Sequence, residues 1–360
     1  MAIKSIGGVS KLSDTDEDLR KLLEARRADI KVMGIGGAGN NTVSRMMQVG
    51  IVGAEVVAIN TDAQDLLYTD ADRKVLIGKD LTKGLGAGAD PKVGMEAARE
   101  SREDIKDALK GGDMVFVTCG LGGGTGTGAS PIIAEIAQKL GLLTVGVVTL
   151  PFSMEGRQRM SNAQMGLENL QKNVDTLIII PNDKLLEIVP DVSVVTAFKV
   201  CDEILVNAVK GVTELVTKPG LVNLDFADIR AVMTDGGLAM IGLGESDTEN
   251  RAVEAVEKAL NNPLLDVEIE EANGALVNVS GGTDITIREC QEIVEAISAK
   301  ISSDAKIIWG AQISKELGDI VRALLIVTGV EAHETYAYGE RVFPREKQKE
   351  IEKILGIDFV

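Results

Sequence analysis

Short apolar runs alternate with helical stretches along most of the chain. From residue 29 onward, five runs rich in Val, Ile and Leu have the length and composition of buried strands. These runs lie at 30–35, 55–60, 113–119, 142–150 and 175–181. Helical segments separate them, at 40–49, 91–110, 129–140 and 156–172. Continuous apolar strands separated by helices are typical of a sheet buried on both faces, so the pattern predicts a doubly wound, parallel α/β domain.

A long amphipathic helix follows this region. Pro190 and Pro219 bracket it, and apolar residues recur with helical spacing across 196–218. Beyond it, strands are expected at 237–244, 274–281, 305–313 and 321–330, and helices at 226–234, 249–261 and 286–301. Because few helices separate these later strands, the pattern predicts a smaller α+β domain.

These patterns divide the chain of 360 residues into five parts. We expect an N-terminal extension with a charged helix at 1–29, an α/β domain at 30–195, a central helix at 196–220, a C-terminal α+β domain at 221–332 and a polar tail at 333–360. The N-terminus lacks the apolar core of a signal peptide, and the longest near-apolar stretch, at about 11 residues, is too short to span a bilayer. The sequence therefore predicts a cytoplasmic protein.

Charge and cysteine usage exclude further classes. The net charge is −17 and the aromatic residues number only Phe 6, Trp 1 and Tyr 3. Nucleic-acid binding normally needs a basic stripe or stacking platforms, so no nucleic-acid partner is expected. Cys119, Cys201 and Cys290 form no CxxC pair, and the single histidine, His333, gives no zinc spacing with them. We expect buried cysteines in a reducing compartment and no metal held by protein ligands.

Glycine is in excess and gathers in three loops. The chain holds 39 glycines, whereas a typical usage of about 7 % gives about 25. The loops lie at 34–41, 84–90 and 119–130, and the third has six glycines within the nine positions 120–128. Each glycine costs folding entropy, so we interpret these six as backbone amides bared to an anion at a helix N-terminus and not as packing. Thr125 and Thr127 add hydroxyl donors.

The first loop leaves an alternative open. Gly34, Gly36 and Gly39 fit the GxGxxG pattern of a dinucleotide site, as in an NAD-dependent dehydrogenase. The acidic residue expected about 20 positions later is replaced by the triplet 60–62, Asn-Thr-Asp, which weakens that hypothesis. No Walker GxxxxGK[ST] pattern is present, so a polyphosphate would be held by amides, helix dipoles and Mg²⁺. Three loops at one sheet edge suit a longer phosphate chain than a single pyrophosphate.

Several motifs together resemble the tubulin/FtsZ superfamily. GGGTGTG at 122–128 resembles its signature, GGAGNN, NTDAQ and GLGAGADP resemble its other nucleotide loops in order, and NLDFADIR at 223–230 resembles its catalytic loop. The resemblance covers about 30–330, and the compact form without a long C-terminal linker is similar to archaeal members. It implies a self-assembling cytoskeletal GTPase of cell division that binds GTP or GDP with Mg²⁺ and forms head-to-tail filaments.

The resemblance also implies which residues contact the nucleotide. The phosphate contacts would be Gly36, Gly37, Ala38, Gly39 and Asn40 in the first loop, Ala87, Gly88 and Ala89 in the second, and Gly122, Gly123, Gly124, Thr125, Gly126, Thr127 and Gly128 in the third. Asn60 and Asp62 would orient Mg²⁺-bound water, or else only form a turn. Glu155 and Arg159 match ribose-side positions, or else form a charge pair at a helix start.

At the base end, the resemblance implies roles for two residues of the long helix. Phe198 would stack on guanine, with core packing as the alternative. Asp202, one turn later, would accept from guanine N1–H and the 2-amino group. Adenine offers no such pair of donors on that edge, so a carboxylate here is also a physical argument for guanine.

Asn223, Asp225 and Asp228 are the predicted catalytic residues. Asp225 and Asp228 are three apart, which places both carboxylates on one face of a helix start, where simple capping is the alternative. A preceding helix of about 20 residues is roughly 30 Å long, so it would separate these acids from the phosphate loops. The family's answer is head-to-tail stacking, in which the acids of one subunit complete the site of the next and the open contact produces filaments.

Two further expectations concern turnover and partners. The retained acids favour a hydrolase over a tubulin-like nucleotide-bound scaffold with little turnover, which stays an alternative. No basic amphipathic helix is visible, so direct membrane insertion is not expected. The partners implied are further copies of the chain and a membrane adaptor or other division proteins, at the mid-cell division ring. The apolar end of the tail, LGIDFV, would dock such an adaptor or pack on the small domain.

Overall fold

The computed structural model describes residues 28–188, 193–218, 220–222, 224–265, 267 and 269–330. The tail expected at 333–360, and the extension at 1–29 except for its last two residues, lie outside this part of the chain.

Six parallel strands form the first half of the sheet. They are β1 (Ile30–Ile35), β2 (Ala54–Asn60), β3 (Arg73–Leu76), β4 (Met114–Gly120), β5 (Leu143–Leu150) and β6 (Thr176–Pro181), in the order β3-β2-β1-β4-β5-β6. The five predicted strands are confirmed within one residue at each end. The short edge strand β3 was not predicted, because only one of its four residues is buried and it carries no apolar run.

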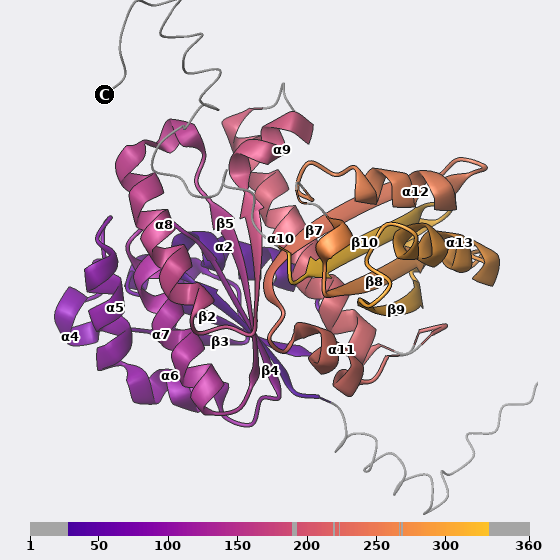
Figure 1. Cartoon of the computed structure of the whole chain (residues 1–360). Helices are drawn as coiled ribbons and strands as arrows, with labels where there is room; N and C mark the ends of the chain where they lie inside the picture. The colour runs from indigo at the N-terminus through magenta and orange to yellow at the C-terminus, as the bar shows by residue number, and fades with distance from the viewer. Residues whose placement is uncertain are drawn as a thin grey trace, which may run out of the picture.

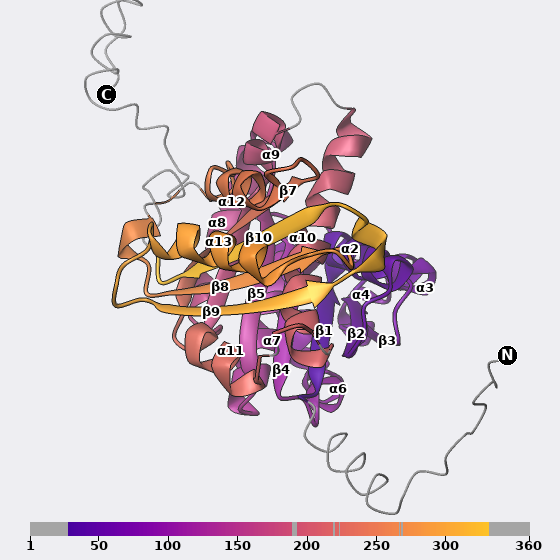
Figure 2. The ribbon, with the colours of Figure 1, turned by 90° about the vertical axis from the view of Figure 1, so that its right-hand side faces the viewer.

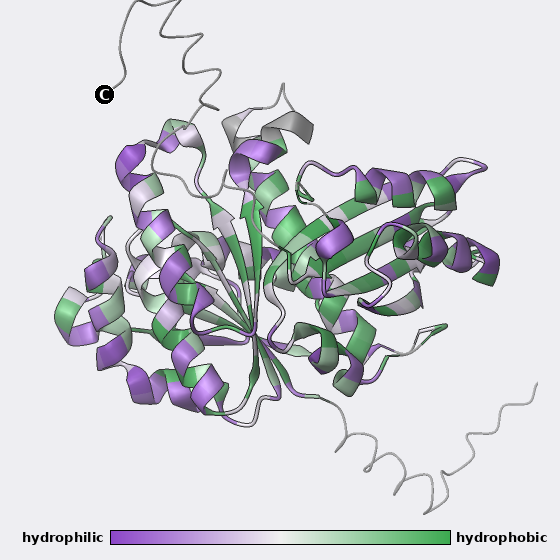
Figure 3. Cartoon of the chain, in the orientation of Figure 1, coloured by the Kyte–Doolittle hydropathy of each residue, from purple (hydrophilic) through white to green (hydrophobic). Residues whose placement is uncertain are grey.

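Helices cover both faces of this half. On one face lie α5 (Pro91–Glu100), α6 (Arg102–Leu109), α7 (Thr125–Lys139) and α8 (Arg157–Gln171), and on the other lie α2 (Gly36–Val49) and α10 (Val194–Thr217). Shorter helices are α3 (Ala63–Tyr68), α4 (Lys79–Thr82) and α9 (Asn182–Ile188). Figure 3 shows apolar strands between helices whose outward faces are polar. The predicted doubly wound arrangement is confirmed.

The sheet continues without a break into the second half. Strands β7 (Gly237–Ser246), β10 (Val321–Thr328), β8 (Gly274–Gly281) and β9 (Lys306–Ile313) extend it to ten strands in the order β6-β7-β10-β8-β9. Strand β10 is antiparallel to both neighbours, and β7 pairs with β6 only over 176–178. Helices α12 (Arg251–Leu260) and α13 (Ile287–Ser298) cover one face, and α11 (Phe226–Met233) the other. The expected second α+β unit is therefore joined to the first through a shared sheet.

Two helices begin about four residues earlier in the chain than the sequence pattern predicted. Helix α2 begins at Gly36 and α7 at Thr125, so glycines of the first and third loops form the first helical turns. Intrinsic propensity disfavours glycine in a helix, which is why the sequence pattern placed these residues in loops. The helix predicted over 91–110 is divided at Ser101, whose hydroxyl accepts from Gly78 N at 2.9 Å.

The long helix α10 runs between the two ends of the molecule. Its 24 residues correspond to about 36 Å at 1.5 Å per residue. After it, α11 lies at the amino ends of the parallel strands, where Arg230 Nη2 donates to the carbonyl of Asp113, directly before β4. The glycine loops lie at the opposite, carboxyl ends. Figures 1 and 2 both place α11 at the opposite end of the molecule from α9, which follows the carboxyl end of β6.

Candidate nucleotide site

The three glycine loops interlock at the carboxyl edge of the sheet. A Cβ placed on Gly36 would lie 2.9 Å from Gly126 N, which shows how closely the first loop approaches the third. A Cβ placed on Gly124 would lie 2.5 Å from the carbonyl oxygen of Gly88, so the second loop lies against the third as well. The loops therefore form one continuous surface, although they are far apart in the sequence.

Close packing involves five of the six glycines in the third loop. A Cβ on Gly128 would lie 1.9 Å from the carbonyl oxygen of Pro91, and one on Gly126 would lie 2.8 Å from that of Gly120. With Gly124, these positions need glycine because other backbone passes through the space a side chain would fill. A Cβ on Gly120 or Gly122 would also lie 2.7 Å from a side-chain carbon, of Ala38 and Arg159 respectively. The interpretation that the six glycines do not serve packing is thus wrong for five of them. In contrast, a Cβ on Gly123 meets no atom within 4 Å, so this position faces open space.

Hydroxyls and one unpredicted amide brace the loops. Thr127 Oγ1 accepts from Gly122 N at 2.8 Å, and the hydroxyls of Thr61 and Thr125 lie 2.6 Å apart. Asn162 on α8 donates through Nδ2 to the carbonyls of Ala89 and Gly122, at 3.0 and 3.3 Å. Asn162 therefore joins the second loop to the third. Because Asn162 belongs to no sequence motif, only this three-dimensional contact reveals its role.

The Asn-Thr-Asp triplet is built as a helix cap. Asp62 Oδ1 accepts from the amides of Gln64 and Asp65 at 2.9 and 3.1 Å and so caps α3. The unpredicted carboxylate of Asp65 then accepts from Asn60 Nδ2 at 2.6 Å and Asn40 Nδ2 at 3.2 Å. Asn40 Oδ1 is buried and has no hydrogen-bond partner within the described residues. The predicted turn is present, and it brings Asn40 and Asn60 together at one carboxylate.

The ribose-side residues form a single unit with the aromatic pair. Glu155 Oε1 accepts from Phe152 N at 2.8 Å, and its Oε2 lies 3.0 Å from Arg159 Nε. Phe152 in turn contacts Phe198 edge to face, with ring centroids 5.3 Å apart. Phe198 is 44 % exposed, so the core-packing alternative is wrong and its ring remains available for stacking.

Asp202 lies one turn beyond Phe198 and is half-buried. Its Oδ1 accepts from Thr42 Oγ1 of helix α2 at 3.1 Å. Burial raises the pKa of this carboxyl to about 6, an effect that the Thr42 hydrogen bond opposes. The helix thus presents a carboxylate and an exposed ring one turn apart.

The predicted catalytic acids Asp225 and Asp228 lie at the opposite end of the sheet, near the amino ends of the parallel strands. Asp225 precedes α11, and its backbone amide donates to Asp228 Oδ2 at 3.2 Å, which is half of a capping box. Both residues are exposed. Asn223 lies outside the described residues. The structure therefore places the two acids together but does not bring them to the phosphate loops of the same chain.

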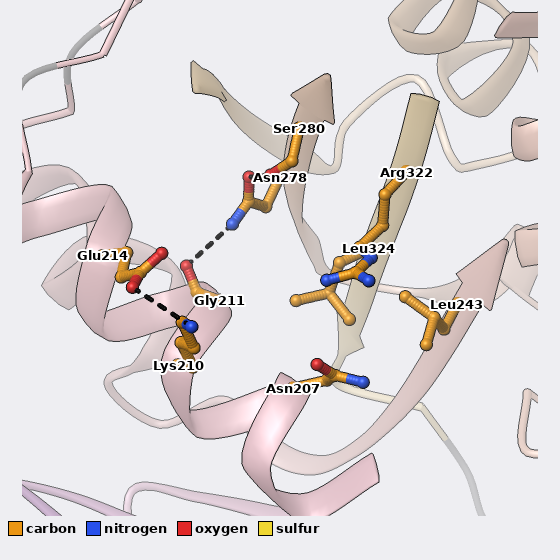
Figure 4. A pocket seen from close by; sticks show the side chains of 9 residues that line it. All are labelled: Asn207, Lys210, Gly211, Glu214, Leu243, Asn278, Ser280, Arg322 and Leu324. Atoms are coloured by element: carbon orange, nitrogen blue, oxygen red, sulfur yellow. Dashed lines mark hydrogen bonds and ion pairs between the residues drawn. The ribbon is translucent and has the colours of Figure 1, made fainter. Parts of the chain in front are cut away.

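A small cavity elsewhere does not belong to this site. It lies between α10 and the strands β7, β8 and β10, and Asn278 Nδ2 donates across it to the carbonyl of Gly211 at 2.9 Å (Figure 4). None of its lining residues comes from the three glycine loops.

Comparisons with known proteins decide the family. The pattern described as "Tubulin/FtsZ family, GTPase domain" matches residues 29–190, and "FtsZ family, C-terminal domain" matches residues 237–331. Cell division protein FtsZ 1 of Thermococcus kodakarensis is 60% identical over 94% of this chain and 91% of its own length. The chain belongs to the FtsZ family.

Solved FtsZ structures agree with this assignment. The structure titled "FtsZ dimer, empty" from Methanocaldococcus jannaschii matches with a TM-score of 0.85 at 59% identity, covering 88% of this chain and 93% of that one. CetZ1 from Haloferax volcanii, bound to GDP, matches at 26% identity with a TM-score of 0.73, covering 92% of this chain and 100% of that one. The predicted FtsZ-like fold and the GTPase class are confirmed.

Three further observations concern the cysteines, metal ligands and membrane spans of the described residues. Cys119, Cys201 and Cys290 are free and buried, as predicted. No group of three or more His, Cys, Asp or Glu is arranged to hold a metal ion in the described part of the chain. Over the same residues, no helix has the length and apolar character needed to cross a membrane.

Proposed function

We propose that this FtsZ-family GTPase binds GTP at the carboxyl edge of its sheet and hydrolyses it only when the acids of a second copy reach that edge. The observation that carries the proposal is the separation of the two halves of the site. Strand β4, with seven residues, spans about 23 Å between them at about 3.3 Å per residue. No side chain of Asp225 or Asp228 bridges that distance.

Residues at the carboxyl edge of the sheet would bind the phosphates, the base and the ribose. The interlocked loops present backbone amides and the first turns of α2 and α7, where the helix dipole favours a phosphate. Phe198 supplies a face for the base, and Asp202 accepts from the two guanine donors. Glu155 and Arg159 then lie beside the aromatic pair on the ribose side.

Hydrolysis needs a water positioned in line with the γ-phosphate. Phosphoryl transfer demands mainly positioning and charge stabilisation from the protein. Asp225 and Asp228 are exposed at the start of one helix. Delivered to the loops of the neighbouring copy, with Asn223, they would orient or activate that water.

Magnesium would act through the phosphates. The described residues offer no protein cage for the ion, so phosphate oxygens and water would hold it. Asn60 and Asp62 are the candidates to orient that water. Mg²⁺ would neutralise charge that develops on the phosphates. Residues 36–40, 87–89 and 122–128 would provide the remaining phosphate contacts.

The cellular setting is proposed from the family. Head-to-tail copies make an open, heterologous contact that propagates as a filament. We place the filament in the cytoplasm at the mid-cell division ring, attached to the membrane through an adaptor that docks on the tail.

The test is the GTPase rate per subunit as a function of protein concentration. An interface site predicts a rate close to zero at nanomolar protein and a steep rise above a threshold. A constant rate per subunit would show that each chain hydrolyses GTP alone. Phosphate release that stays negligible at every concentration would favour the scaffold alternative. Extraction of the bound nucleotide tests the dehydrogenase alternative, which predicts NAD in place of GDP.

A further inference from the structure

Two helices meet beside the proposed guanine pocket. Helix α2 begins at the phosphate loops, and helix α10 carries Asp202. Thr42 of α2 is fully buried between them, and Arg45, one turn later, donates through Nε to Glu203 Oε1 at 2.7 Å. The two contacts lie next to each other, so the position of Asp202 relative to the phosphate loop is fixed from α2.

The hydroxyl of Thr42 has two acceptors in reach. Its Oγ1 lies 3.1 Å from Asp202 Oδ1 and 3.1 Å from the carbonyl oxygen of Ala38. Ala38 is one of the proposed phosphate-loop residues. A single hydroxyl proton therefore lies between the group that reads the base and the loop that holds the phosphates.

We propose that Thr42 is a specificity-determining residue for the nucleotide, which orients the Asp202 carboxylate in its ionised form toward guanine. The inference rests on the proposed guanine site. With Oδ1 oriented by the Thr42 hydroxyl, the carboxylate plane is fixed before the base arrives. Pre-organised acceptors lose less entropy on binding than freely rotating ones.

The protonation state of Asp202 decides which acceptor Thr42 uses. When Asp202 is ionised, the Thr42 hydroxyl donates to it in a charge-assisted bond, which is stronger than a neutral one. When Asp202 is protonated, its own O–H donates to Thr42 Oγ1, and the Thr42 proton turns to Ala38. Burial and the neighbouring Glu203 raise the pKa of Asp202, while Thr42 and Arg45 lower it. Loss of the Thr42 hydroxyl removes one of the two stabilising contacts.

The experiment compares Thr42→Val, which keeps the shape and loses the hydroxyl, with Thr42→Ser, which keeps the hydroxyl. The matched control is Thr213→Val on α10, a fully buried threonine whose hydroxyl has no partner within the described residues. For each protein, the affinities for GDP and for IDP, which lacks the 2-amino group, are measured between pH 5 and pH 8.

Thr42→Val should weaken GDP binding about tenfold. Its preference for GDP over IDP should fall, and the pH midpoint of GDP binding should move upward. Thr42→Ser and Thr213→Val should stay within about threefold of the unchanged protein. A Thr42→Val protein with the original affinity, preference and midpoint would overturn the inference. So would a loss of affinity without any change of preference or midpoint, because that result describes a merely structural residue.

Two further measurements keep the test decisive. If Thr42→Val does not fold, Thr42→Ala is measured in the same way. In an Asp202→Asn background the effect of Thr42→Val should shrink to about twofold, since the carboxylate it acts on is gone. An undiminished effect there would contradict the inference. If the unchanged protein does not prefer GDP to ADP, the proposed guanine site fails, and that outcome is separate from any Thr42 result.

Discussion

The two ends of the sheet are built in opposite ways. At the carboxyl edge the loops interlock: a Cβ on Gly128 has no room, and Thr127, Asn162 and Asp65 tie neighbouring segments together. At the amino edge, Asp225 and Asp228 are exposed, and the backbone amide of Asp225 donates to the Asp228 carboxylate. A rigid, pre-organised half and an open half are what an interface site requires. The difference supports the proposal that one chain binds the nucleotide at its carboxyl edge and supplies its acids to the site of another copy.

The largest difference between the two edges is expected when an acid is removed from the amino edge. Asp228→Ala should lower the GTPase turnover about 10²–10⁴-fold, the range typical for a catalytic acid or base. GDP affinity should stay unchanged, because the binding edge lies elsewhere. Turnover and equilibrium binding are measured on the same preparation. Glu257→Ala, an exposed acid on α12, is the matched control and should retain full turnover. Loss of GDP binding in Asp228→Ala would make Asp228 structural.

A pair of glycine variants tests the binding edge. Gly123→Val places its side chain in open space, so the fold should be unaffected while GDP affinity falls at least about a hundredfold by blocking the phosphates. Gly128→Ala forces a Cβ against Pro91 and should destabilise the fold by about 1–3 kcal/mol. Thermal unfolding and GDP titration separate the two effects. Normal GDP binding by Gly123→Val would show that the phosphates do not bind at this loop.

The pH dependence of GDP binding tests the base end. The pKa of Asp202 is raised to about 6 by burial, and guanine needs the ionised form. Affinity should therefore be nearly full at pH 7 and above, about half of that at pH 6, and fall up to about tenfold for each unit further below. Titrations at pH 5, 6, 7 and 8 measure this slope. Asp202→Asn should lose the part of the slope that Asp202 causes, so its slope should be clearly smaller than that of the unchanged protein. An unchanged slope in this variant would assign the titration to another group, such as the terminal phosphate of GDP.

A small effect is expected from the anchor of the acid helix. Arg230 donates to the carbonyl of Asp113 at 3.3 Å and lies over the Phe226 ring at 5.1 Å. Arg230→Ala should cost about 1 kcal/mol of stability and lower turnover a few-fold by loosening α11. Nucleotide affinity should not change. Stability from chemical unfolding and turnover at saturating GTP measure these two effects, and altered GDP affinity would mean that the two edges are not independent.

Much of the fold could be predicted because its strands are continuous apolar runs. β4 and β5 are buried on both faces, so their composition alone identifies them. The edge strand β3 was missed because edge strands bury little surface. The glycine loops and the long helix also predicted that the candidate phosphate loops and the acids lie at opposite ends of the molecule, as the structure shows.

The rest depends on contacts between distant segments. Asn162 and Asp65 carry no motif, and their roles appear only when α8 meets the third loop and α3 meets Asn40. Likewise, the sequence could not distinguish glycines that pack tightly from glycines that face open space, because both contribute equally to the number of glycines in the loop. The shared sheet was also not predictable, since the β6–β7 pairing spans only 176–178 and leaves no pattern in either strand.

The most direct test of a site divided between two copies is a mixing experiment with Asp228→Ala and Gly123→Val. Each variant alone should be nearly inactive, one for lack of the acid and the other for lack of the nucleotide. Mixed one to one, they form some interfaces with an intact edge from each partner, up to about a quarter of all contacts if pairing is random. The account predicts turnover well above the sum of the separate proteins. Turnover equal to that sum would contradict it.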